Sequence, residues 1–397
     1  MISSILPTYS RTPLNFVNGK GSWLTEADGR HFLDFGSGIA VNALGHSHPA
    51  LIKSLTNQAN KLWHVSNLFD IPQQKELADK LIKETFADTV FFTNSGTESC
   101  ELAVKMVRKF WFDKDKADRI DIIGFNGSFH GRSTAGIAAS GEKKLTEGFG
   151  PLLPGFFHVN WLDRKALKEL ISETTAAIII EPIQGEGGIR PCTADWLKEL
   201  REICDENDLL LIFDEVQCGA ARSGKLFASE WSEVSPDIMM TAKGIGGGFP
   251  LGAVLATENA ASGMTVGTHG STFGGNPLAC AIGNTVFDII SDPKFLKEIR
   301  SKSLLFVEKL KALVSSFPDI LLEVRGQGLM QGLVCKIKNT DFIKACHEET
   351  LITIPAADNV VRLLPPLNIT YEELSIGVEK LRNAAAKCRS EKSGVKK

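Results

Sequence analysis

The sequence predicts an α/β protein with a large, mostly parallel sheet domain and a smaller α+β domain. Short β-rich apolar runs alternate with amphipathic helical stretches through the middle of the chain, which is typical of parallel strands covered by helices. After about residue 290 the pattern changes to long helices with few strands. With 397 residues the chain is long enough to bury a large core and to form two domains.

Hydrophobic periodicity predicts each element in turn. Apolar runs predict strands at residues 90–92, 120–123, 177–180, 210–213 and 238–240. Apolar side chains repeating on one face predict helices at residues 101–112, 165–172 and 195–207. Beyond residue 290 we expect a helix at residues 295–314 and a strand at residues 323–326. The predicted division is a large domain at residues 56–288, a small domain at residues 289–397, and an N-terminal segment at residues 1–55 that packs with the small domain.

Composition and charge narrow the classes of function. Hydrophobic residues make up 43% and charged residues 23% of the chain, as in ordinary globular proteins. The formal net charge of −3 predicts neither nucleic acid nor an anionic membrane as a partner. The eight cysteines form no Cys-x-x-Cys pair, so we expect no metal site and no disulfide framework. The chain lacks a secretory signal and a membrane-length apolar run, which predicts a cytoplasmic protein.

A lysine and an aspartate carry the strongest chemical signal. Asp214 ends an apolar strand, and Lys243 precedes the glycine run at residues 246–248, which allows a close approach to backbone. Pyridoxal phosphate chemistry needs an amine that condenses with the aldehyde, and a carboxylate that keeps the pyridine nitrogen protonated. Taken alone, Lys243 fits a solvated loop and Asp214 fits a helix cap. Together and in this order, they favour a pyridoxal phosphate site.

Other polar runs also follow predicted strands, where ligands collect in parallel sheets. The run NSGTE at residues 94–98 precedes a helix, so it could hold a phosphate or simply cap that helix. In FNGSFHGR at residues 125–132, Phe129 could stack on a ring and Arg132 could clamp a carboxylate. Taken alone, that run favours a surface loop with one buried phenylalanine.

Two glycine-rich runs supply further candidates. EPIQGEGG at residues 181–188 places Glu186 in a tight loop, where it could pair with an arginine or stay exposed. HGSTFGGNP at residues 269–277 offers the hydroxyls of Ser271 and Thr272 to a phosphate or substrate, or merely forms a turn. His46 and His48 lack a nearby acid or cysteine, so a structural role is favoured over metal binding.

These runs together resemble the class III aminotransferases, the ω-aminotransferase group of fold type I pyridoxal phosphate enzymes. The resemblance extends from DFGSGIAV at residues 34–41 to VRLLPP at residues 361–366, nearly the whole chain. The runs ALGH, LWHVSN, EPIQGEGG and DEVQCG are most similar to the branch that uses acetylornithine. One departure is Ala220-Ala221, in a loop that normally contains glycine.

The resemblance implies roles in cofactor binding. The implied cofactor-binding positions are Ser95, Gly96, Thr97, Phe129, Asp214, Glu215, Val216, Gln217, Lys243 and Thr272. Lys243 is the implied Schiff-base and proton-transfer lysine, and Asp214 is the implied partner of the ring nitrogen. Thr272 is expected to come from the partner subunit, which implies a homodimer with sites at the interface.

The resemblance also implies how the substrates are held. Arg132 and Ser271 would contact an amino donor whose amine is remote from its α-carboxylate. Arg362 would bind the α-carboxylate of glutamate or 2-oxoglutarate. Glu186 would cover Arg362 while the first substrate is bound.

The expected reaction is transfer of the 5-amino group of N2-acetylornithine to 2-oxoglutarate, in arginine biosynthesis. Succinyldiaminopimelate, ornithine and 4-aminobutyrate remain alternative donors. Residues 36–44 contain no tyrosine, whereas ornithine aminotransferases carry one nearby, which disfavours ornithine. A mutase would not need the Glu186–Arg362 pair. A pyridoxal-phosphate-binding regulator would need a DNA-binding segment, and the sequence shows none.

Overall fold

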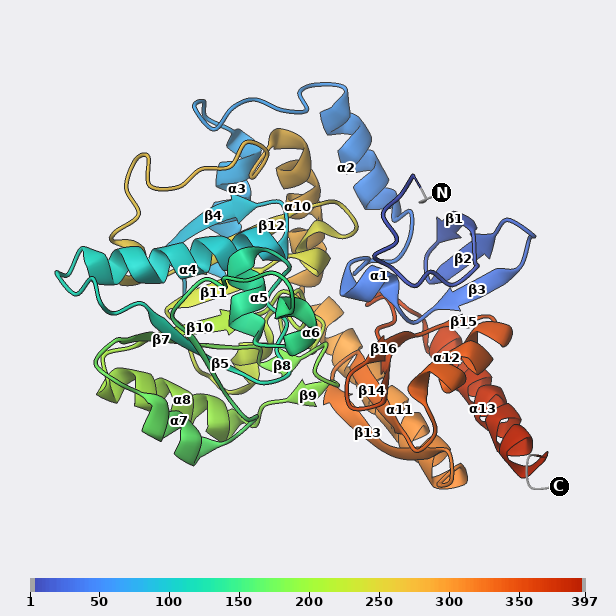
Figure 1. Ribbon diagram of the computed structural model, residues 1–397. Coiled ribbons are helices and arrows are strands. Elements are labelled where there is room, and N and C mark those ends of the chain that lie inside the picture. The colour runs from blue at the N-terminus through green and yellow to red at the C-terminus, as the bar shows by residue number, and fades with distance from the viewer. Residues whose placement is uncertain (1–3, 395–397) are drawn as a thin grey trace.

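The computed structural model describes residues 4–394, so the outermost residues of the predicted segments 1–55 and 289–397 lie outside the described residues. Its centre is a seven-stranded sheet (Figure 1). In spatial order the strands are β4 (Thr89–Thr93), β12 (Gly252–Ala256), β11 (Ile238–Thr241), β10 (Leu210–Asp214), β7 (Thr175–Ile180), β5 (Asp121–Phe125) and β6 (Phe156–Val159). Only β12 runs antiparallel to its neighbours in this sheet, so the predicted mostly parallel α/β class is confirmed.

Helices cover both faces of this sheet because its strands are apolar on both sides. In β10, Leu210 and Ile212 pack toward α4 (Gly96–Phe112), whereas Leu211 and Phe213 pack toward α7 (Arg164–Leu170) and α8 (Ala194–Glu206). The two-residue period of a strand produces this alternation. Figure 1 shows α4 on one side and α7 with α8 on the other. The expected strands and helices of this region are therefore confirmed, with ends shifted by a few residues.

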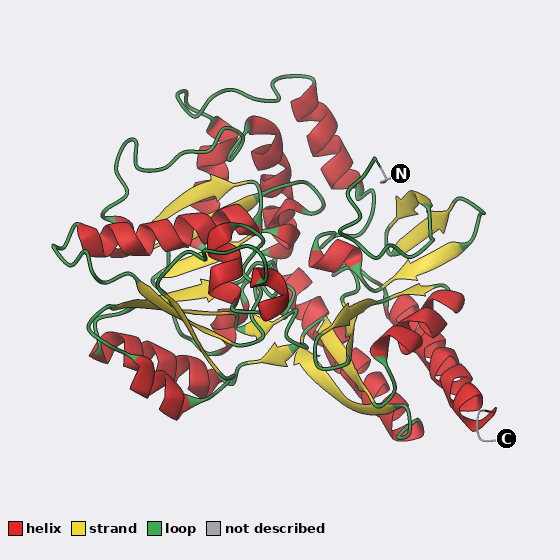
Figure 2. Ribbon diagram, viewed as in Figure 1, coloured by secondary structure: helices red, strands yellow, loops and turns green. Residues whose placement is uncertain are grey.

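Two smaller sheets lie beside the large one (Figure 2). The first joins β1 (Phe16–Lys20), β2 (Trp23–Glu26) and β3 (His31–Asp34) to β15 (Leu351–Ile352), which pairs parallel to β3. The second is antiparallel, in the order β13 (Leu321–Gln327), β14 (Met330–Cys335), β17 (Val360–Leu363) and β16 (Ile354–Ala356). The start of the chain thus pairs with a strand near its end, while the domain boundaries at 55 and 288 stay predictions.

The remaining elements connect these sheets. The short hairpin of β8 (Ile183–Gln184) and β9 (Arg190–Pro191) lies beside β13 (Figure 1). The other helices are α1 (Ser37–Ala40), α2 (Pro49–Ala59), α3 (Pro72–Lys83), α5 (Thr134–Ser140), α6 (Lys143–Thr146), α9 (Glu258–Ala261), α10 (Pro277–Ile290), α11 (Pro293–Ser316), α12 (Asn339–Glu348) and α13 (Tyr371–Gly394), with 3-10 turns η1 (Ala228–Trp231) and η2 (Lys243–Gly246). Within residues 4–394 no helix is both long enough and apolar enough to cross a membrane.

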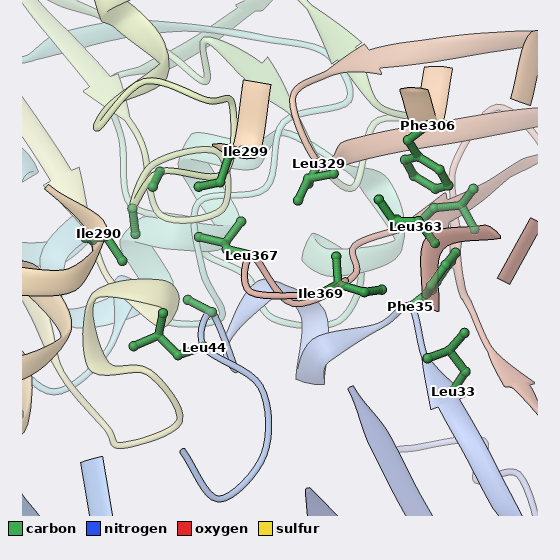
Figure 3. Close-up of a cluster of buried hydrophobic side chains, with 14 of the residues drawn as sticks. Leu33, Phe35, Leu44, Ile290, Ile299, Phe306, Leu329, Leu363, Leu367 and Ile369 are labelled. Carbon is green, nitrogen blue, oxygen red and sulfur yellow. The ribbon is translucent and has the colours of Figure 1, made fainter. Parts of the chain in front are cut away.

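One hydrophobic cluster joins all three predicted segments (Figure 3). Leu33 and Phe35 come from the N-terminal segment, Val286 comes from the large domain, and Phe306 and Leu363 come from the C-terminal region. These side chains are at most 1% exposed. Because separating the segments would expose this apolar surface, burial fixes where β17 lies relative to the large sheet.

Two alanines adopt a left-handed backbone in the loop after β10. Ala220 has φ 49° and Ala221 has φ 66°. This region is costly for residues with a Cβ and easy for glycine. The backbone therefore explains why similar sequences place glycine in this loop.

The start of α8 provides a test of local stability. Thr193 caps this helix, and its hydroxyl oxygen accepts a hydrogen bond from the Trp196 N–H at 3.1 Å. We expect Thr193→Ala to lower the free energy of unfolding by about 1 kcal/mol, because that N–H loses its acceptor. Equilibrium urea unfolding measures the change. Thr193→Ser retains the oxygen and is the matched control, so equal losses in both variants would contradict this assignment.

Candidate active site

A cavity lies where the strands of the large sheet end. Eight of the predicted cofactor-binding residues line it: Ser95, Gly96, Thr97, Phe129, Asp214, Val216, Gln217 and Lys243. His130, Gly131 and Glu181 complete the lining. Asp214 ends β10, Lys243 follows β11, and the run at residues 94–98 follows β4. The expectation that these side chains meet beyond the strand ends is therefore met by the geometry.

Lys243 has a strained backbone and a perturbed amine. Its φ is 50°, in the left-handed region that a residue with a Cβ enters at a cost, and such strain often accompanies a functional site. Burial lowers the pKa of the Lys243 amine, and the nearby positive charge of Arg362 lowers it further. A lowered pKa increases the fraction of neutral, nucleophilic amine at neutral pH.

The glycine run after Lys243 is explained by protein packing. A Cβ on Gly247 would come within 2.7 Å of Val286, and one on Gly248 within 2.8 Å of Asn42. Gly247 also has a left-handed φ of 57°. The run therefore lets the chain turn tightly against other protein atoms, and residues 246–248 do not line the cavity that contains Lys243.

Asp214 is held by a histidine. The Asp214 carboxylate accepts from the Val216 N–H at 3.0 Å and lies 2.7 Å from Nδ1 of His130. Burial opposes a charge on His130, but the hydrogen bond and negative charge of Asp214 prevail and raise the pKa of His130. Nε2 of His130 is buried and has no hydrogen-bond partner among the described residues. These two contacts fix the position of the Asp214 carboxylate.

His130 is a site residue to which sequence reasoning assigned no role. It lies in the run at residues 125–132, next to Phe129, but 84 positions from Asp214. A histidine placed directly after a strand was the available signal. Its partner became evident only from the packing of β5 against β7 and of β7 against β10.

Two further carboxylates near Asp214 have different surroundings. Glu181 accepts from the N–H groups of Phe129 and Gly185, both at 3.2 Å, and burial raises its pKa to about 7. Glu215 is also buried, which raises its pKa to about 7. Its carboxylate accepts from the N–H groups at the start of η1, so it does not line the cavity.

The start of α4 faces the cavity. Ser95 accepts from the Glu98 N–H at 3.3 Å, so the predicted helix cap is present. The first N–H groups of a helix lack intrahelical acceptors, which leaves those of Gly96 and Thr97 available to an anion. A Cβ on Gly96 would lie 2.7 Å from Val216, so glycine allows Val216 to approach this turn. The run at residues 94–98 can therefore cap the helix and bind an anion at the same time.

Arg362 and Glu186 form a direct ion pair. Nη1 of Arg362 donates to Glu186 at 2.6 Å and to Gln217 at 2.9 Å, and Nη2 donates to the Pro355 carbonyl at 3.0 Å. The Arg362 side chain is 1% exposed, whereas that of Glu186 is 35% exposed. The guanidinium is therefore fixed in the interior, and its carboxylate partner has access to solvent.

The other predicted substrate residues lie at the surface of this chain. Arg132 is exposed, with its guanidinium 5.5 Å from the ring centre of Phe129. Ser271 and Thr272 line a separate hollow with Asn94 and do not line the Lys243 cavity. Ser271 accepts from the Gly274 N–H at 2.9 Å, which shapes its loop.

The charges around Lys243 generate a titration test. In the ligand-free protein the Lys243 amine should titrate below the ordinary value of 10.5. Arg362→Gln should raise the pKa of Lys243 because it removes a positive neighbour, and Glu186→Gln should lower it because it removes a negative one. Reductive ¹³C-methylation followed by NMR titration measures the pKa, and Lys243→Arg assigns the resonance. Shifts of the same sign in both variants would contradict the proposed electrostatics.

This chain is similar to several known aminotransferases. The model of the family "Aminotransferase class-III" matches residues 5–385. Acetylornithine aminotransferase of Rhodobacter capsulatus is 62% identical over 386 residues, covering 97% of this chain and 98% of the relative. The structure of N-acetylornithine aminotransferase from Stenotrophomonas maltophilia is 35% identical, with a TM-score of 0.85 and coverage of 96% of this chain and 98% of that chain.

A structure with lower sequence identity to this chain has a higher TM-score. Ornithine aminotransferase of Toxoplasma gondii is 30% identical, with a TM-score of 0.94 and coverage of 98% of this chain and 94% of that chain. A second structure of the Toxoplasma enzyme shows partial occupancy of pyridoxal phosphate at its active site. This chain therefore belongs to the class III aminotransferases, pyridoxal-phosphate-dependent transferases of fold type I.

Proposed function

We propose that the chain transfers the 5-amino group of N2-acetyl-L-ornithine to 2-oxoglutarate, giving N-acetyl-L-glutamate 5-semialdehyde and glutamate. The observation that carries this proposal is the Arg362–Glu186 pair beside Lys243. Arg362 suits the α-carboxylate of glutamate, and Glu186 can neutralise Arg362 when the bound donor has its amine remote from its α-carboxylate. The high identity to acetylornithine aminotransferases supports this choice of donor.

The cavity residues fit pyridoxal phosphate chemically. The start of α4 suits a phosphate, the Asp214 carboxylate suits a protonated pyridine nitrogen, and the Lys243 amine suits an aldehyde. Phe129 and Val216 supply apolar surface for a ring, and Gln217 supplies a polar side chain for its phenolic oxygen. When bound, the cofactor supplies an aldehyde that takes up an amino group and a ring that accepts electrons.

The chain's own residues would move and stabilise the protons. The neutral amine of Lys243 would take the proton from C5 of acetylornithine and later return one to C2 of the keto acid. Asp214 would hold a proton on the ring nitrogen through its negative charge, and the hydrogen bond with His130 would keep that carboxylate in position. Glu181 would support this arrangement by fixing the backbone of Phe129.

Two arginines would distinguish the substrates. Arg132 would bind the α-carboxylate of acetylornithine at the exposed mouth of the site, and Ser271 would contact that substrate from a second copy, because it lies outside the Lys243 cavity of its own chain. Arg362 would bind the α-carboxylate of glutamate or 2-oxoglutarate after Glu186 turns away toward solvent. This arrangement places the amine to be transferred at the same position for both substrates. The reaction fits a step of arginine biosynthesis in the cytoplasm.

We also propose that the enzyme is a homodimer. Large apolar side chains are exposed along the two hollows that Ser271 lines, among them Leu68 at 88% and Phe273 at 59%. Exposed apolar surface of this kind often marks a protein interface. A second copy covering it would place Thr272 near the partner's cavity, where its hydroxyl would serve the phosphate.

The first test follows the amino group without a keto acid. Adding N2-acetylornithine to the cofactor-loaded enzyme should convert the aldehyde form of the cofactor to the amine form, and 2-oxoglutarate should then restore the aldehyde form. Absorption spectroscopy follows both steps. We expect higher kcat/KM for acetylornithine than for succinyldiaminopimelate, ornithine or 4-aminobutyrate, measured in parallel. A clear preference for one of those donors would reject the proposed substrate, and failure of 2-oxoglutarate would favour a mutase.

The second test asks which subunit supplies Thr272. Lys243→Ala should abolish turnover, and Thr272→Ala should weaken cofactor binding. Mixing the two variants under subunit exchange should restore about a quarter of the parent activity, because half of the dimers formed at random then contain one intact site. If Thr272 serves the cavity of its own chain, no mixed dimer contains an intact site. Activity that does not rise above the unmixed Thr272→Ala sample would therefore contradict the shared site.

A further inference from the structure

The loop that carries Glu186 is attached to the hairpin that carries Arg362. Besides the direct ion pair, the Glu186 carbonyl accepts from the Ala357 N–H at 2.9 Å. Four residues further on, Arg190 forms two hydrogen bonds to the Asp358 carboxylate, one of them 3.0 Å long from Nε. The loop is thus attached to residues 357–358 at two points, one at the Glu186 backbone and one at the Arg190 side chain.

The hairpin tip is built to hold Asp358 in place. Residues 357–360 form the turn between β16 and β17, with φ 55° at Asp358 and φ 58° at Asn359. Aspartate and asparagine tolerate this left-handed turn better than most residues. The Asn359 amide donates to the carbonyls of Cys335 and Ile337, which ties the turn to the end of β14.

A second arginine completes the network. Nη1 of Arg325 donates to Asp358 at 3.1 Å, so this carboxylate lies between two guanidinium groups. Arg325 and Arg190 are about a quarter exposed, at 28% and 26%, and Asp358 is 36% exposed. The packing behind the loop is close, because a Cβ on Gly188 would lie 3.0 Å from both the Ala357 carbonyl and Asp358.

We propose that Asp358 is a positioning residue for the substrate switch. By holding Arg190 it fixes the backbone of the loop at residues 184–190, so that opening of the switch is confined to the Glu186 side chain. The fixed backbone presents the Glu186 carboxylate to Arg362 and strengthens its competition with an incoming α-carboxylate. This inference rests on the proposed function, since it assigns the competitor as glutamate or 2-oxoglutarate.

Asp358→Asn is the informative variant, because asparagine tolerates the left-handed turn but lacks the charge. We expect the ratio of kcat/KM for glutamate to kcat/KM for acetylornithine to rise roughly threefold. A change of this size corresponds to the free energy that a partly exposed ion pair contributes. Glu186→Gln should raise the ratio further. In the double variant, Asp358→Asn should cause no further rise in this ratio, because it acts on the ratio only through Glu186.

Asp319→Ala is the matched control. It removes a partly exposed aspartate–arginine pair with Arg389 at a distance in sequence from the switch, so the substrate ratio should stay at the parent value. Two results would overturn the proposal. One is an equal loss of kcat/KM for both substrates in Asp358→Asn, and the other is an undiminished change in the substrate ratio when Asp358→Asn is added to Glu186→Gln.

Calorimetric binding of glutarate to the cofactor-loaded enzyme gives a readout that needs no turnover. Glutarate is an unreactive dicarboxylate that competes with Glu186 for Arg362, so Asp358→Asn should tighten its binding roughly threefold. Unchanged glutarate affinity would overturn the positioning role. A parent enzyme that rejects acetylornithine would instead overturn the proposed substrate and would leave the glutarate comparison valid.

Discussion

Charge compensation in a confined space is the constraint on which the site depends. The Arg362 guanidinium is 1% exposed, and an uncompensated charge in such a position costs several kcal/mol. Glu186 supplies the compensating charge, while Gln217 and the Pro355 carbonyl satisfy further N–H groups. The carboxylate of Glu186 can therefore leave only as another carboxylate arrives. The same positive charge favours the neutral amine at Lys243, so in the proposed reaction it would link substrate recognition to proton transfer.

These groups meet because strand ends from distant parts of the chain converge. Asp214 ends β10 and Lys243 follows β11, the neighbouring strand. Arg362 instead lies in β17 of a separate sheet, whose position is fixed by the apolar cluster around Phe35, Phe306 and Leu363. Burial of that cluster thus has an electrostatic consequence, since it holds a guanidinium close enough to Lys243 to alter its pKa.

Local sequence patterns predicted much of this arrangement. The features that they did not predict have physical causes. The continuous apolar runs of β7 and β10 were visible in the sequence, but the antiparallel direction of β12 was not, because it depends on pairing with β4 and β11. Asp214 and Glu215 are adjacent and both acidic, yet Glu215 lies just past the end of β10 and its carboxylate accepts from the N–H groups at the start of η1. His130 could not be paired with Asp214 because no local rule joins residues 84 positions apart.

Under the proposed function, the unequal burial of Arg362 and Glu186 would allow one cavity to accept two kinds of substrate. A permanently free Arg362 would bind any α-carboxylate, and a permanently covered one would admit none. Glu186 is 35% exposed, so on leaving the pair its carboxylate can be hydrated, which offsets part of the lost attraction. Arg362 meanwhile retains its hydrogen bonds to Gln217 and Pro355 and stays aligned. The exchange of carboxylates then costs little, because the buried partner stays still and only the hydrated one moves.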